Sequence, residues 1–139
     1  MKTESNTESA ELLHCAVATS SEENADAVFR RLFGMSVVKE FMVGEELGRA
    51  LFGFGGQAKV IVYSAGGATI EAFISPERSG ALDRYDHICL ATRNRLDLIE
   101  RASRMGMSVS SFAREGGDVV FIRDSDGNFY EIKEKEGTG

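Results

Sequence analysis

The sequence predicts an α+β fold built from two tandem copies of one βαβββ module. Its 139 residues, of which 42% are apolar, are enough for one compact core. Strand and helix patterns follow one another in the same order in both halves of the chain. Short stretches of sequence also recur, since GMSV at 34–37 returns as GMSV at 106–109. The two halves are therefore one structural unit used twice.

The first module begins with a strand and a helix. The apolar, partly β-branched run 12–19 has the length of a strand. A helix over 21–33 is predicted by apolar residues at helical spacing. Ser20 and Glu23 form a capping box for it, and Gly34 supplies its stop.

Three further strands complete the first module. The run 36–43 is the second strand, and 58–65 and 69–75 form a hairpin around a Gly-Gly turn. The Gly-rich segment 44–57 fits no single element. Its FGFGG run at 52–56 lacks the Lys-Ser/Thr of a phosphate-binding loop, so we expect a loop or hairpin that lines the pocket.

The second module repeats this order after a linker at 76–83, which holds the only proline. Its first strand is 85–92. Asn94 caps a helix over 95–105, which Gly106 stops. The remaining strands are 108–115, 118–124 and 129–135.

The domain organisation follows from these elements. We expect a disordered polar tail over 1–10 and a single domain over 11–139, with module one at 11–76 and module two at 84–136. The net charge of −6 offers no basic surface for a phosphate backbone, which argues against nucleic-acid binding. No apolar stretch is long enough to span a membrane and the start is polar, so we expect no membrane partner and a cytoplasmic protein.

The two cysteines indicate a reducing compartment. Cys15 and Cys89 are too few for a disulfide framework, and both lie in apolar runs, where we expect small buried hydrophobes. Cys89 shares a strand face with a histidine, but we interpret it as an apolar space-filler and not as a thiolate ligand or nucleophile.

Strand alternation gathers four polar residues on one surface. In each strand one face is apolar enough to pack under the helices, which leaves the other face uncovered. The residues on this uncovered face are His14, Glu71, His87 and Glu131. Two imidazoles and two carboxylates suit a divalent metal. A single such residue on an open sheet is usually only solvated, but the repetition of the pattern in both modules favours a site.

Several sequence stretches resemble the vicinal-oxygen-chelate superfamily, which includes glyoxalase I, methylmalonyl-CoA epimerase, extradiol dioxygenases, fosfomycin-resistance thiol transferases and bleomycin-resistance proteins. These stretches are LHCAVAT, DHICLAT and FIRDSDGNFYEI, and the resemblance covers 12–135. It implies curved mixed β-sheets around a metal-binding cleft with helices outside, and a homodimer. It also implies one divalent ion (Zn, Ni, Co or Mn) held by His14, Glu71, His87 and Glu131.

Position 71 indicates the branch of this family. Dioxygenases and thiol transferases lack a ligand there and epimerases typically carry Gln, so Glu71 points to glyoxalase I. The resemblance departs at Ala18, where glutathione-dependent glyoxalases place an Arg that holds a substrate carboxylate. The identity of the thiol is therefore open.

The resemblance implies a glyoxalase I-like lyase or isomerase, which moves a proton through a metal-stabilised enediolate on a small 2-oxo/2-hydroxy thiol-adduct substrate. Glu71 and Glu131 are the alternative catalytic bases. An acyl-CoA epimerase of methylmalonyl-CoA type, favoured by Ala18, and a non-enzymatic small-molecule binding or resistance protein are the alternatives. Whether the cleft forms within one chain or across two is also open.

Five arginines are candidates for an anion clamp, with scattered surface charge as the alternative interpretation. They are Arg49, Arg78, Arg84, Arg114 and Arg123.

Overall fold

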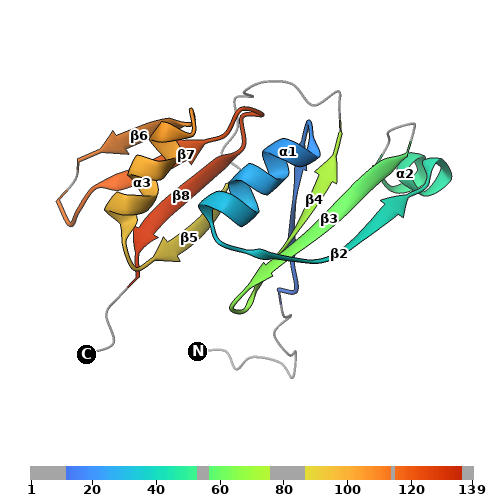
Figure 1. Ribbon diagram of the computed structural model, residues 1–139, viewed down its shortest axis with the longest axis horizontal. Coiled ribbons are helices and arrows are strands. Elements are labelled where there is room, and N and C mark those ends of the chain that lie inside the picture. The colour runs from blue at the N-terminus through green and yellow to red at the C-terminus, as the bar shows by residue number, and fades with distance from the viewer. Residues whose placement is uncertain (1–11, 53–56, 76–86, 114, 136–139) are drawn as a thin grey trace, which may run out of the picture.

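The predicted fold class is confirmed by the computed structural model, which describes residues 12–52, 57–75, 87–113 and 115–135 (Figure 1). Module one contains β1 (Cys15–Thr19), α1 (Glu22–Ala25), η1 (Asp26–Leu32), β2 (Ser36–Val43), α2 (Glu45–Phe52), β3 (Ala58–Ala65) and β4 (Ala68–Ile74). Module two contains β5 (Ile88–Thr92), α3 (Arg95–Arg104), β6 (Ser108–Phe112), β7 (Val119–Arg123) and β8 (Phe129–Glu134). Within the described part of the chain, no helix is long and apolar enough to cross a membrane.

Each module forms a mixed four-stranded sheet with the same topology. The strand orders are β1-β4-β3-β2 and β5-β8-β7-β6. In both sheets the first and last strands of the module pair in parallel, and the other pairs are antiparallel. The register is also repeated, because Ala16 lies opposite Glu71 and Cys89 lies opposite Glu131.

The helix of module one is continuous from α1 into the π-helical η1. Ser21 caps it by accepting a 3.0 Å hydrogen bond from the Asn24 amide, so the predicted Ser20 cap is wrong by one residue. Buried side chains at helical spacing hold it on the sheet, and they include Val28 and Phe29. Gly34 ends it with a φ of 71°, a conformation that favours glycine.

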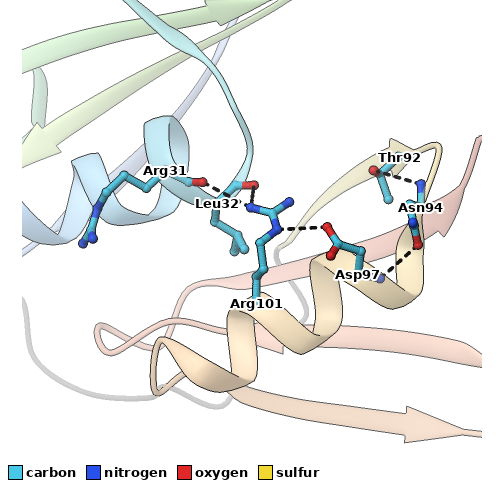
Figure 2. Close-up of polar contacts among 6 residues, drawn as sticks. All are labelled: Arg31, Leu32, Thr92, Asn94, Asp97 and Arg101. Atoms are coloured by element: carbon cyan, nitrogen blue, oxygen red, sulfur yellow. Dashed lines mark hydrogen bonds and ion pairs between the residues drawn. The ribbon is translucent and has the colours of Figure 1, made fainter.

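The helix of module two is capped as predicted. The Asn94 side chain accepts a 3.0 Å hydrogen bond from the Asp97 amide (Figure 2). Gly106 ends the helix with a φ of 87°.

Helix α2 was not predicted from the sequence. It occupies most of the segment 44–57, with two glutamates in its first turn and an ion pair from Arg49 to Glu45. The FGFGG run lies mostly beyond it, at 53–56, outside the described residues. The predicted tail at 1–10 and linker at 76–83 also lie outside the described residues.

The two modules share one hydrophobic core at their junction. The helix-covered faces of both sheets contribute to it, and so do η1 and α3, which contact each other. The Tyr130 ring from β8 packs edge-on against Phe29 and Phe33, at centroid distances of 6.0 and 5.3 Å. Arg101 of α3 donates hydrogen bonds to the carbonyls of Arg31 and Leu32 at the end of η1 (Figure 2). The modules are therefore fixed together on the side that carries the helices.

The loop between β7 and β8, at 124–128, also joins the modules. The buried Asp126 carboxylate accepts hydrogen bonds from the Thr19 hydroxyl, the Ser20 amide and the Asn24 side chain, at 2.8 to 2.9 Å. The Asn128 side chain donates to the Ala18 carbonyl at 2.8 Å. The loop thus ties the end of β1 and the start of α1 to module two.

Candidate metal centre

The first pair of predicted ligands, His14 and Glu71, meets on the uncovered face of the first sheet. His14 directly precedes β1, two positions before Ala16, which lies opposite Glu71 of β4. His14 therefore lies on the same face as Glu71. Its Nε2 is 3.4 Å from Glu71 Oε1, and the two side chains are 46% and 18% exposed.

The second pair, His87 and Glu131, has the same geometry on the second sheet. His87 directly precedes β5, two positions before Cys89, which lies opposite Glu131 of β8. The Nε2 to Oε1 distance is again 3.4 Å, and the side chains are 35% and 20% exposed. The internal repeat of the sequence is therefore also a repeat of side-chain geometry.

The donor atoms of each pair are spaced as neighbouring ligands of one metal ion. Ligand atoms about 2.0 to 2.2 Å from a tetrahedrally coordinated ion lie about 3.4 Å from one another. Each pair offers one imidazole nitrogen and one carboxylate oxygen, a donor set that suits Zn, Ni, Co or Mn. Each pair can therefore supply two neighbouring ligands of a divalent ion.

The two pairs do not combine within one chain. Among the described residues, no group of three or more His, Cys, Asp or Glu side chains is placed to hold a metal ion. The cause lies in the shared core, which contains the opposite faces of the strands, including Ile70 and Tyr130. Both pairs therefore lie on faces that point away from the module junction.

Solved structures contain the same arrangement of elements. A glyoxalase family protein from Bacillus cereus aligns with a TM-score of 0.72 and 17% identity, over 97% of this chain and 100% of that chain. The trypanothione-dependent glyoxalase I of Leishmania major aligns with a TM-score of 0.66 and 14% identity, over 91% and 87% of the two chains. A mutant of the fosfomycin resistance protein FosX from Listeria monocytogenes, in complex with Mn(II) and a dihydroxypropylphosphonic acid, aligns with a TM-score of 0.69 and 16% identity, over 91% and 90%.

The chain has the vicinal-oxygen-chelate fold. The alignments cover nearly all of both chains, so the likeness includes both modules and not one alone. Neither a protein-family model nor a curated protein matches the sequence.

The two His–Glu pairs of this chain have different surroundings. Beside the first pair, Val60 and Val62 are buried in a small aliphatic cluster against Phe73. Beside the second pair, Phe121 packs edge-on against both His87 and Phe129, at centroid distances of 5.0 and 5.9 Å. The residue opposite the glutamate is therefore the aliphatic Val62 in the first pair, whereas the second pair has an aromatic wall of Phe121 and Phe129.

Cys89 lies next to the second pair and is exposed, so the prediction that it is buried is wrong. Partial desolvation, followed by the charge of Glu131, raises the pKa of its thiol. Cys15 is partly buried and packs against the core on the covered face, so for this residue the prediction is confirmed in part. The two cysteines differ in burial because they occupy opposite faces of equivalent strands: Cys15 lies opposite Ile70, and Cys89 lies opposite Glu131.

Two hollows of the described surface lie away from both pairs. One of about 210 Å³ lies at the module junction beside Arg31, Leu98 and Arg101. The other, of about 290 Å³, is lined by acidic side chains of α1 and by Tyr63. Burial is the main cause that raises the pKa of Tyr63 to about 12. Neither hollow contains a predicted ligand.

Sequence reasoning did not single out the aromatic wall. Phe121 lies opposite Glu131 in the β7–β8 register, and Phe129 is two residues before Glu131 on the same strand. Strand parity alone places both on the face of Glu131. The alternation of side chains in FIRDSDGNFYEI therefore predicts that both rings lie beside Glu131, whereas the histidine and glutamate pattern alone does not.

Proposed function

We propose that the chain is a glyoxalase I-like enzyme that depends on one divalent metal ion per site. The observation that carries this proposal is the pair of His–Glu contacts, which have the same register and the same 3.4 Å donor spacing in both modules. Unselected surface residues would have no reason to repeat in this way. The likeness in fold to a glyoxalase I and to FosX with Mn(II) supports the proposal.

The complete site is proposed to need two copies of the chain. Each copy carries two half-sites on faces that point away from its own junction. In a twofold dimer, His14 and Glu71 of one chain would meet the partner's His87 and the partner's Glu131, and symmetry would create a second identical site. Each ion would then be held by two histidines and two glutamates. A homodimer would also cover the exposed apolar side chains of β2, which include Val38 and Met42.

The reaction supported best is a proton transfer between adjacent carbons of a small substrate with neighbouring carbonyl and hydroxyl oxygens. When bound, the ion supplies Lewis-acid polarisation of those oxygens. Either Glu71 or Glu131 then accepts the proton from one carbon on a carboxylate oxygen and returns it to the neighbouring carbon. Both carboxylates are about four-fifths buried yet open to the uncovered face, so they can reach a substrate lying there. No oxidant or reductant is needed.

The thiol of the substrate is proposed to differ from glutathione. Ala18 of β1 lies opposite Phe73 and offers no charge at the position where the resemblance predicts an Arg. The trypanothione-dependent glyoxalase I of Leishmania major shows that this fold serves another thiol. The acyl-CoA epimerase alternative is favoured by the same residue and is tested beside it.

The experiment is metal titration followed by two assays. Chelator-treated protein is titrated with Zn, Ni, Co and Mn, and we expect one tightly bound ion per chain. The metal-loaded protein is assayed with methylglyoxal and several thiols, and in parallel with a chiral acyl-CoA thioester. Turnover of a thiol adduct supports the glyoxalase reaction, and thioester epimerisation alone supports the alternative. Protein that binds none of the four metals contradicts the proposal.

A further inference from the structure

Arg123 lies on the same face of the second sheet as the His87–Glu131 pair. It is two residues after Phe121, which lies opposite Glu131, so strand parity gives Arg123 and Glu131 a common face. Its own partner on β8 is Phe129. The β5–β8 register, continued by one residue, places His87 opposite Phe129 on the other side. Arg123, Phe129 and His87 therefore form one row across three adjacent strands.

The guanidinium of Arg123 lies over the next residue of this row, on the side of the His87–Glu131 pair. Its central carbon lies 3.7 Å from the centroid of the Phe129 ring, in a cation–π contact. The backbones of Arg123 and His87 are about 10 Å apart, or two interstrand spacings. A group bound on the guanidinium would therefore lie within the reach of a small molecule that also contacts the His87–Glu131 pair.

The Arg123 side chain has unused hydrogen-bonding capacity. Its Nη1 is buried, and it has no hydrogen-bond partner among the described residues. Leaving a buried charged donor unpaired is unfavourable, so native proteins seldom retain one without a ligand, an ion or water to satisfy it. Two parallel N–H donors of a guanidinium match the oxygens of a carboxylate or a phosphonate.

The internal repeat shows that this arginine is not a requirement of the fold. The residue of module one at the equivalent register position is Ser64, which lies opposite Thr69. Its hydroxyl donates a 3.0 Å hydrogen bond to the Ala68 carbonyl, so its polar group is satisfied within the hairpin. The sheet thus forms with a short, paired side chain at this position, so its fold does not require a long cation there.

We propose that Arg123 binds an anionic group of the substrate, a carboxylate or a phosphonate, beside the His87–Glu131 pair. This inference rests on the proposed function in one respect, since it takes the bound anion to be a part of the substrate. It places an anion site on β7 of module two, whereas the arginine expected from the family resemblance would stand on β1 at the position of Ala18. The substrates selected would be small metal-chelating molecules that carry an oxyanion.

The test measures anion binding without turnover. Metal-free protein is titrated calorimetrically with inorganic phosphate and, separately, with acetate, which distinguishes the two classes of oxyanion. We expect saturable binding of at least one of them, weakened by about 10- to 100-fold in Arg123→Gln, the range for losing hydrogen bonds to a charged group. Arg123→Lys keeps the charge without the planar donors and should bind with intermediate affinity. It also serves as the second variant if the Gln variant does not fold.

The matched control is Arg104→Gln, which removes an equal charge from the exposed last turn of α3. Wild-type protein that binds neither anion, or an Arg123→Gln variant that loses no more affinity than this control, overturns the inference. Mn(II) binding is measured on the same samples. Arg123→Gln should keep its Mn(II) affinity, whereas wild-type protein without Mn(II) affinity contradicts the proposed function and leaves the anion result standing.

Discussion

Glu71 distinguishes a four-ligand site from a site with three ligands. Replacing Glu71 with Gln keeps an oxygen donor and the volume of the side chain but removes the charge and the basicity. Metal should bind more weakly, and if Glu71 is the base, turnover at saturating metal should fall by about 10²- to 10⁴-fold. Metal titration and steady-state kinetics on the same sample measure the two effects.

Two comparisons make this result specific. Glu100→Gln removes an equal charge from the exposed surface of α3 and should leave both metal affinity and turnover unchanged. His14→Ala and His87→Ala should act mainly through lost metal. An active Glu71→Gln enzyme with unchanged metal content and turnover would show that Glu71 is only a solvated strand residue.

Asp124 is one of the two buried carboxylates of the β7–β8 loop, and burial is the largest cause that raises its pKa above the ordinary value of 3.8. It accepts hydrogen bonds from the Asp126 and Asn128 amides and from the Tyr130 hydroxyl, which oppose this shift. A raised pKa in the folded protein favours folding below pH 3.8, and this contribution is lost as the pH rises through the folded pKa.

In the Asp124→Asn variant the side chain at position 124 does not titrate. The free energy of unfolding of wild type relative to this variant should therefore fall as the pH rises from 3.8 through the raised pKa of Asp124. Urea unfolding at a series of pH values measures the trend. Asp26→Asn should show the opposite trend, because a hydrogen bond from Arg30 lowers the pKa of Asp26 and its contribution is lost as the pH falls. A flat difference for Asp124→Asn would contradict the assignment.

The loop at 124–128 is one of the elements that hold the modules in their relative placement. Asp126→Ala removes the acceptor of three donors from module one and leaves them unpaired at the junction. We expect the free energy of unfolding to fall by about 3 kcal/mol. The neighbouring Ser125→Ala removes one exposed hydrogen bond to Asn24 and should cost less than about 0.5 kcal/mol. Equal urea midpoints for the two variants would show that the loop does not join the modules.

Elements with a clear period were predictable from the sequence. The strand SVVKEFMV has its predicted bounds at 36–43, because its flanking glycines mark both ends. Helix α2 was missed because glycines surround it and one lies within it, which hides a short amphipathic pattern. The cap of α1 is Ser21 and not Ser20, whose amide donates instead to Asp126, a contact between residues far apart in the sequence.

The candidate site, which spans both modules, was predictable in part. Strand parity correctly placed each histidine on the same face as the glutamate of its module. The single surface expected to gather all four side chains is not formed by the described residues of one chain. The placement of one pair relative to the other depends on which faces form the shared core. Contacts of Tyr130, Arg101 and Asp126 across the junction determine which faces are buried there. The periodicity of the sequence does not predict these contacts. The single cleft expected from the sequence is therefore proposed as a cleft between two copies.

The proposed dimer holds each metal ion between the His14–Glu71 pair of one chain and the His87–Glu131 pair of another. Homodimers of His14→Ala and of His87→Ala should each contain only incomplete sites. Random exchange of subunits between them makes half of the dimers mixed, and one of the two sites in each mixed dimer has all four ligands. High-affinity metal sites should therefore return to about a quarter of the wild-type number.

The decisive measurement is metal stoichiometry of the two variants before and after co-refolding, with light scattering to confirm the dimer. We predict almost no tightly bound metal in either variant alone and recovery toward a quarter of the wild-type amount in the mixture. Mixed dimers that recover no metal, from variants that remain folded, would contradict a site shared between two chains.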